Sequence, residues 1–305
     1  MKRMKELWRV AVIVCTAALI FTAGDNETTM RTSQQQLPPV FMETVEVQGG
    51  SFMFGRNGAK KGENDKLVTV STFRIGKYPV TQGQWKAVMG ENPSAFDGTN
   101  AYDYNKDKYV SAKKTFNRDK LPVETVCWYE VLIFANKLSM KENLQPAYKI
   151  KGESDPAKWG GVPTLSNDDW NNVAIDADAN GWRMPSEYEW EFAAKGGRKS
   201  AGYTGTEADT YFIYSGSNDM DEVAWYYENS NDRTHEVGGK KANELGLYDM
   251  SGNVYEWCFD KFAPNREIRV VRGGSWDGKA VYVRSANAFH PRDQRDIIGF
   301  RLVRS

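Results

Sequence analysis

Residues 245–257 read Leu245-Gly246-Leu247-Tyr248-Asp249-Met250-Ser251-Gly252-Asn253-Val254-Tyr255-Glu256-Trp257. Gly252 and Asn253 predict a turn, because glycine adopts positive φ freely and asparagine tolerates it. The residues that follow alternate in the manner of a strand. The side chains of Asp249, Asn253 and Glu256 place oxygen atoms around this turn, where backbone carbonyls also become free. Oxygen ligands favour a hard cation, calcium more than magnesium.

Length and composition narrow the class of protein. The chain has 305 residues, 40 basic and 40 acidic side chains, and 13% aromatic residues. It is long enough to bury the core of one large domain or two smaller ones. A net charge of zero argues against a nucleic-acid partner, which needs a basic surface. Ten tryptophans and 27 glycines indicate a loop-rich fold held by aromatic packing.

The N-terminus has the pattern of a secretory signal peptide. Residues 1–24 combine a basic start, an apolar run over residues 7–21 and small residues at the end. The run is too short and too charged for a transmembrane helix. We therefore expect export to the cell surface or periplasm. The pattern offers one membrane anchor, a lipid attached to Cys15. A strict lipoprotein signal has small residues just before the cysteine, and Val14 departs from this.

Local patterns predict one folded domain over residues 41–305, preceded by a spacer. Residues 25–40 are polar and are expected to form a disordered spacer. Alternation up to Gly49-Gly50 predicts a hairpin within residues 41–55, and residues 67–75 alternate as a further strand. Residues 91–120 are polar without a period and are expected to be an insertion-like loop.

Helices are predicted from caps and from apolar spacing. Thr81 is an N-cap signal for a short helix that ends at Gly90. Ser186, followed three residues later by Glu189, is a capping box that starts another helix. Residues 128–140 carry apolar side chains at helical spacing and predict a core helix.

Further motifs lie on both sides of the 245–257 stretch, in the order Val47-Gln48-Gly49-Gly50-Ser51-Phe52, Pro122-Val123-Glu124-Thr125-Val126-Cys127-Trp128, Arg183-Met184-Pro185-Ser186-Glu187-Tyr188, Arg272-Gly273-Gly274-Ser275-Trp276 and Gly299-Phe300-Arg301-Leu302. Together these motifs resemble the formylglycine-generating enzyme (sulfatase-modifying factor) family. The resemblance implies an α+β, C-type-lectin-like fold, loop-rich, with short strands and about three helices. It also implies a structural calcium ion, with the ligands Asp249, Gly252, Val254 and Glu256, of which the two middle residues supply carbonyls.

The cysteines that catalytic members of the family use for oxidation are missing from this sequence. The family's catalytic members use two cysteines after the Gly-Gly-Ser motif, and residues 277–284 contain none. A copper(I) site needs such thiolates, so no copper is expected. Cys127 and Cys258 lie in scaffold motifs. They either form a disulfide bond with each other or remain two buried thiols. His235 and His290 cannot supply the histidine triad of the related iron-dependent sulfoxide synthases. A non-catalytic binding protein is therefore favoured, with an enzyme of altered chemistry as the alternative.

The segment between Trp276 and Gly299 has the composition of a recognition surface. Polar and aromatic side chains dominate it, and such residues supply contact area and directed hydrogen bonds. The predicted ligand-binding residues are Trp276, Asp277, Tyr282, Ser285, Asn287, Phe289, His290, Arg292, Asp293 and Asp296. The ligand expected there is an unidentified protein or glycan. The alternative is a solvated loop.

The same segment resembles the variable region of diversity-generating retroelement proteins, which share the C-type lectin fold. In those proteins, mutagenesis varies exposed side chains on a fixed scaffold. The resemblance implies fixed anchors at Trp276, Arg284, Arg295, Gly299 and Phe300. It implies that the side chains between these anchors set the ligand specificity.

Overall fold

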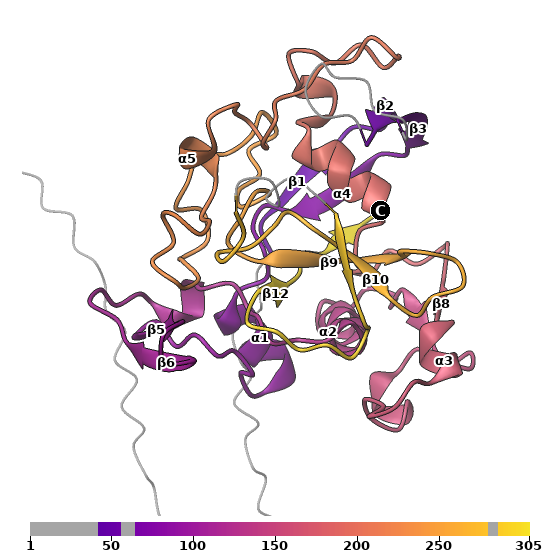
Figure 1. The fold of residues 1–305 in the computed structure, drawn as a ribbon. Coiled ribbons are helices and arrows are strands. Elements are labelled where there is room, and N and C mark those ends of the chain that lie inside the picture. The colour runs from indigo at the N-terminus through magenta and orange to yellow at the C-terminus, as the bar shows by residue number, and fades with distance from the viewer. Residues whose placement is uncertain (1–41, 56–64, 280–285) are drawn as a thin grey trace, which may run out of the picture. The chain divides into compact units, whose positions relative to one another are not determined.

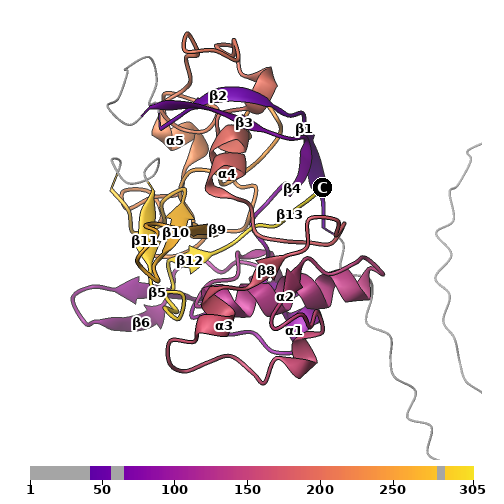
Figure 2. The same cartoon turned by 90° about the vertical axis from the view of Figure 1, so that its right-hand side faces the viewer.

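The computed structural model describes residues 42–55, 65–279 and 286–305. Figures 1 and 2 show these residues from two directions. The predicted signal peptide, the spacer and Cys15 lie outside the described residues. Among the helices that are described, none combines the length and the apolar character needed to cross a membrane.

The Gly252-Asn253 turn leads into the central sheet, as predicted. Gly252 has φ 76° and Asn253 has φ 65°, both in the left-handed region. A Cβ on Gly252 would lie 2.2 Å from the carbonyl oxygen of Trp225, so this close backbone approach requires glycine. Strand β9 (Tyr255–Lys261) begins two residues later.

The central sheet has four strands in the order β11-β10-β9-β12. Strand β10 (Arg269–Arg272) is antiparallel to β9, and β11 (Asn287–Phe289) is antiparallel to β10 and lies at one edge. The short β12 (Ile298–Gly299) runs parallel to β9 at the other edge. Both views show β9 and β10 between helices α2 and α4 (Figures 1 and 2).

Alternate residues of β9 pack into two different cores, because side chains on a strand point to opposite faces. Tyr255 and Trp257 join the core around α2 (Trp128–Lys141). Cys258 joins the other core with Trp190 of α4 (Glu187–Ala194). The sheet is therefore buried on both sides.

The three longest α-helices agree with the predicted caps and periods. Helix α1 (Gln82–Met89) starts with a Thr81 capping box and ends at Gly90, and α4 starts with the Ser186 capping box. The apolar face of α2 is fully buried, as its spacing predicted. The shorter helical elements are α3 (Asp168–Asn171), α5 (Met220–Val223), η1 (Arg118–Lys120), η2 (Pro156–Lys158) and η3 (Gly197–Lys199).

The predicted hairpin within residues 41–55 is wrong. Strand β1 (Thr44–Val47) pairs with β4 (Phe73–Gly76), and β2 (Gly50–Phe54) pairs with β3 (Lys66–Val70). The strand predicted over residues 67–75 is thus interrupted. At the interruption a Cβ on Gly49 would lie 2.7 Å from the backbone of Val70 and Thr72. Glycine therefore permits a close crossing between two strands here, instead of a turn.

The segment predicted to be an insertion-like loop contains a hairpin. Strands β5 (Asn100–Asp103) and β6 (Lys108–Ser111) pair with Tyr102 opposite Tyr109. The remaining strands are β7 (Tyr148–Lys149), β8 (Ala174–Ile175) and β13 (Val303–Arg304), of which β13 pairs with β4. Sequence periodicity did not find β5 and β6, because each strand is short and its apolar surface comes from tyrosine rings.

The capping box of α4 makes a first prediction. The Ser186 hydroxyl accepts a hydrogen bond from the Glu189 amide at 3.2 Å, and the Glu189 carboxylate accepts from the Ser186 amide at 2.8 Å. We expect Ser186→Ala to lower the free energy of unfolding by about 1 kcal/mol, measured by urea denaturation. Ser186→Thr keeps the hydroxyl and should cost only a few tenths of a kcal/mol. Equal losses in both variants would refute the capping role.

Candidate ligand-binding site

Aromatic and acidic side chains line an open pocket of about 530 Å³. We call it the tyrosine pocket. Tyr102, Tyr104 and Tyr109 come from the β5–β6 hairpin, and Trp276 and Asp277 follow the Gly-Gly-Ser motif. The other residues that line it are Ala95, Thr125, Gln294, Arg295, Asp296 and Ile297. The pocket thus joins four segments of the chain, at residues 95–109, 125, 276–277 and 294–297.

The carboxylates of Asp277 and Asp296 make the tyrosine pocket acidic. Asp296 accepts a hydrogen bond from the Tyr109 hydroxyl at 2.6 Å, and Asp277 accepts one from the Ser275 hydroxyl at 2.5 Å. Burial, together with the charge of Asp296, raises the pKa of Asp277 above its usual range. Because Arg295 supplies the one guanidinium among the lining residues, the two carboxylates leave the pocket with a net negative charge.

Tyr104 and Tyr109 offer exposed aromatic faces. Their exposed fractions are 50% and 38%. Tyr104 lies 6.4 Å from the Trp276 ring, centroid to centroid. An aromatic wall beside carboxylates is suited to a cation, which is attracted by the ring face as well as by the negative charge.

Thr125 lines the pocket and Glu124 is its buried neighbour, and neither was predicted as a site residue. Glu124 is fully buried and accepts hydrogen bonds from the Ala95 and Phe96 amides at 3.1 and 2.9 Å. Burial raises the pKa of Glu124 to about 8. Thr125 has φ 60°, a conformation that is rare for a β-branched residue and marks local strain. Glu124 belongs to the Pro122–Trp128 family motif. Its role could not be predicted from that motif, because the amides that donate to its carboxylate lie 28 and 29 residues earlier in the chain.

The structure brings together three of the predicted ligand-binding residues, Trp276, Asp277 and Asp296. Trp276 is 2% exposed and donates from Nε1 to the Asp296 carbonyl at 3.0 Å, so it serves mainly as an anchor. Of the other predicted anchors, Gly299 and Phe300 are buried, Arg295 is exposed and Arg284 lies outside the described residues. Tyr282 and Ser285 also lie outside the described residues.

The remaining predicted residues lie on β11 and the turn after it. Asn287 is exposed at the sheet edge, and Phe289 packs against Tyr255 and Trp257 with the Arg295 guanidinium 4.7 Å from its ring centroid. Arg295 therefore lies between Phe289 and the tyrosine pocket.

His290, Arg292 and Asp293 form a separate polar group. His290 Nε2 lies 3.3 Å from a Glu267 carboxylate oxygen, and the His290 amide donates to Asp293 at 3.2 Å. Arg292 donates to the Thr164 carbonyl at 2.6 Å. These contacts turn the group toward Thr164 and Glu267, so it does not line the tyrosine pocket.

The predicted calcium ligand Glu256 is fully buried and already has partners. Its carboxylate accepts from Arg301 Nε at 2.6 Å, from Arg301 Nη2 at 2.7 Å and from Trp190 Nε1 at 2.6 Å. The guanidinium neutralises the charge that a calcium ion would otherwise neutralise. The side-chain contacts of Glu256 thus fit Arg301 and do not fit a calcium ion.

Asp249, the other predicted side-chain ligand of calcium, is also buried. It accepts from the Gly238 amide at 2.7 Å, and burial raises its pKa to about 6. Gly252 and Val254 are buried beside it in the turn. Among the described residues, no group of three or more His, Cys, Asp or Glu side chains is arranged to hold a metal ion. Calcium binding stays a prediction that these contacts do not support.

Cys127 and Cys258 are two separate buried thiols, so the disulfide alternative is wrong. Burial raises the pKa of both thiols above their usual range. A thiol with a raised pKa is a poor nucleophile and a poor metal ligand. Neither cysteine lines the tyrosine pocket.

Comparisons with known proteins identify the family model and the proteins that this chain resembles. The model of the sulfatase-modifying factor enzyme 1-like domain matches residues 28–305. Chaperone protein LppX of Paenibacillus barcinonensis is 39% identical over 264 residues, which cover 77% of this chain and 78% of that protein. Inactive C-alpha-formylglycine-generating enzyme 2 of Mus musculus is 27% identical over 282 residues, which cover 86% of this chain and 85% of that protein.

The solved structure of Treponema denticola variable protein 1 superposes with a TM-score of 0.68 and 33% sequence identity, and covers 86% of this chain and 94% of that chain. This match confirms the predicted loop-rich fold class of α-helices and short strands.

The Glu256–Arg301 pair makes the second prediction. Either Glu256→Gln or Arg301→Met leaves a buried polar group without its partner, and we expect the free energy of unfolding to fall by about 3–5 kcal/mol. The loss should be the same in calcium and in a calcium chelator, because Arg301 is the partner of Glu256. Guanidinium chloride unfolding of both variants measures this.

The control is the exposed pair of Arg74 and Glu46, 3.5 Å apart. Arg74→Met should cost less than about 1 kcal/mol, because water screens exposed charges. If the chelator destabilised the wild-type protein and left Glu256→Gln unaffected, calcium would be the partner of Glu256 instead.

Proposed function

The chain belongs to the family of sulfatase-modifying factor enzyme 1-like domains, and on that basis we propose that it is a non-catalytic member that binds a ligand at the tyrosine pocket. The observation that carries the proposal is the pocket itself. It combines the tyrosine rings of the β5–β6 hairpin with the carboxylates of Asp277 and Asp296, and Asp277 lies in the segment after the Gly-Gly-Ser motif, where residues 277–284 contain no cysteine.

A protein ligand that presents a lysine or arginine side chain suits this pocket best. The carboxylates of Asp277 and Asp296 supply acceptors for a cationic head group, and the rings of Tyr104 and Tyr109 supply faces for its apolar stem. The exposed edge of β11 and the polar group around His290 extend the surface next to the pocket. A glycan would also stack on tyrosine rings but would gain less from the negative charge.

Two of the relatives support binding in preference to catalysis. One of them is by name a chaperone protein, and chaperones act by binding other proteins. Another is by name inactive. Treponema denticola variable protein 1 supports the further hypothesis that residues 277–298 vary between copies of the gene, as in diversity-generating retroelement proteins.

Export and surface display complete the proposal. The signal-peptide pattern of residues 1–24 and the polar spacer of residues 25–40 are its basis, and a lipid on Cys15 is the proposed anchor. A spacer between an anchor and a folded domain would let the pocket reach a ligand outside the cell.

Peptide display tests the proposed ligand class. We expect peptides selected on the purified chain to be rich in lysine or arginine. Their binding should weaken about tenfold in Asp296→Asn and in Tyr104→Ala, because each variant removes one element of the cation site. Asp178→Asn and Phe262→Ala change exposed residues outside the pocket and are the matched controls.

Two results would contradict the proposal. Selective binding to a glycan array that the same pocket variants abolish would assign a glycan ligand. Oxygen consumption with a thiol peptide and added copper would restore the enzyme alternative.

A further inference from the structure

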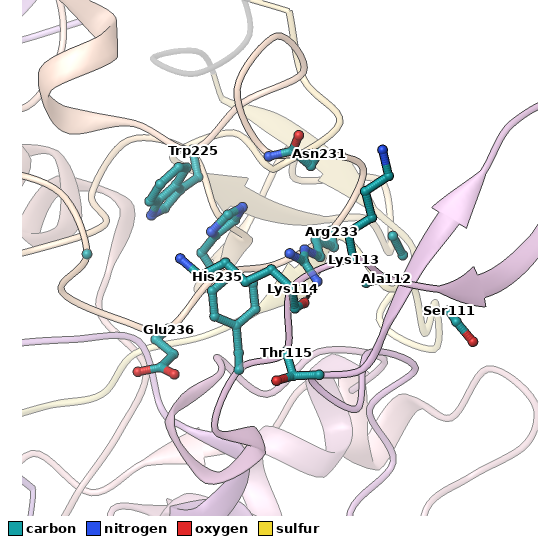
Figure 3. Close-up of a pocket in the computed structure, with 13 residues that line it drawn as sticks. Ser111, Ala112, Lys113, Lys114, Thr115, Trp225, Asn231, Arg233, His235 and Glu236 are labelled. Atoms are coloured by element: carbon teal, nitrogen blue, oxygen red, sulfur yellow. Dashed lines mark hydrogen bonds between the residues drawn. The ribbon is translucent and has the colours of Figure 1, made fainter.

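A second pocket, of about 850 Å³, lies on the other side of the β5–β6 hairpin, where residues 111–116 meet the loop of residues 225–239. Figure 3 shows its side chains. We call it the basic pocket. The residues that line it are Ala101, Ser111, Ala112, Lys113, Lys114, Thr115, Phe116, Trp225, Asn231, Arg233, His235, Glu236 and Gly239. None of the predicted ligand-binding residues is among them.

Arg233 is a buried cation that forms no ion pair with any residue that the structure describes. It is 5% exposed, and its guanidinium lies 4.4 Å from the Phe116 ring centroid. Nη1 donates to the Lys114 carbonyl, while Nε has no hydrogen-bond partner among the described residues. Burial lowers the pKa of Arg233, and no neighbouring carboxylate of the described residues opposes this. A buried charge without a partner is costly, and a bound anion would remove the cost.

The surroundings add positive charge. Lys113 and Lys114 are exposed at the pocket's rim. Lys240 lies with its ammonium 4.2 Å from the Trp225 ring centroid. The carboxylate of Glu236, the one acidic lining residue, accepts a hydrogen bond from the Asn117 amide at 2.9 Å. The pocket therefore carries a net positive charge.

The wall of the pocket is flat and aromatic. The His235 ring stacks on Trp225 (Figure 3), with centroids 3.7 Å apart. The centroid of the Phe116 ring lies 5.0 Å from that of His235. Burial and the nearby cations Arg233, Lys114 and Lys240 lower the pKa of His235 to about 4, so it is neutral at pH 7. Such a wall is suited to the apolar body of a ligand.

The central turn holds the pocket in shape. Asn253 accepts from the His235 amide and donates to the His235 carbonyl, both at 3.1 Å. The basic pocket is thus fastened to the Gly252-Asn253 turn that starts β9. A site built on a rigid element needs little reorganisation to bind its ligand.

We propose that the basic pocket binds a small organic oxyanion, in which a carboxylate, sulfate or phosphate group is joined to a flat apolar body. Arg233 is its counterion, Lys113 and Lys114 attract it, and the aromatic wall holds its body. The site is separate from the tyrosine pocket, and the two can be tested independently.

Isothermal titration calorimetry with the purified chain tests this site. The probes are benzoate, phenyl sulfate and phenyl phosphate, which differ in the anionic group, and neutral benzyl alcohol is the control ligand. We expect saturable binding of at least one anionic probe with a Kd of about 1 mM or tighter, and none of benzyl alcohol. The ranking of the three anions identifies the preferred group.

Two variants assign the binding to the pocket. Arg233→Met should raise the Kd of the preferred anion at least about tenfold. The double change Lys113→Met and Lys114→Met alters exposed residues, so it leaves the fold intact and should still weaken binding. Arg198→Met, an exposed basic residue of η3, is the matched control and should bind as the wild type does. Failure of all three anions to bind, or binding that neither pocket variant weakens, would overturn the proposal.

Discussion

The buried ion pair between Glu256 and Arg301 is the contact on which the rest of the fold depends. Both side chains are fully buried, and the Arg301 guanidinium also donates to the carbonyls of Gly76 and Tyr248 at 2.9 and 2.8 Å. Trp190 adds a donor from α4. One side chain near the C-terminus therefore ties together β4, β9 and the loop before the central turn, and Glu256 ties α4 to them. Burying these charges is costly, so each needs the other to be present.

This scaffold presents two pockets of opposite charge on the two sides of the β5–β6 hairpin. Tyr102, Tyr104 and Tyr109 face the acidic tyrosine pocket, while Ala101 and Ser111 line the basic pocket. Ala101 and Tyr102 are neighbours on β5, so their side chains point to opposite faces and β5 contributes to both sites. The backbone amide of Tyr102 donates to the Asp232 carbonyl at 2.9 Å, which ties the hairpin to the loop of the basic pocket.

Local signals in the sequence predicted the local structure well. The caps at Thr81 and Ser186, the core helix and the Gly252-Asn253 turn need only residues a few positions apart, and all are confirmed. The family motifs predicted the fold class. The same motifs also pointed to Trp276 and Asp277, which do line a pocket.

Contacts between distant segments were not predictable in this way. Gly49-Gly50 has the composition of a turn, but its conformation is decided by the backbone of Val70 and Thr72 more than twenty residues later. Glu256 has the chemistry of a calcium ligand, and its partner Arg301 is 45 residues away. Tyr102, Tyr104 and Tyr109 lie in a polar stretch whose pattern gives no sign of their common pocket. No local pattern encodes which segment lies opposite another in space.

We propose that the fixed scaffold carries a ligand-binding surface that changes between copies of the gene. Sequencing the 3′ end of the gene across many isolates, with the neighbouring DNA, tests it most directly. The account predicts substitutions concentrated between residues 277 and 298, beside a near-repeat and a reverse transcriptase gene, with Glu256, Trp276 and Arg301 unchanged. A uniform segment, or substitutions spread evenly through the scaffold, would contradict it.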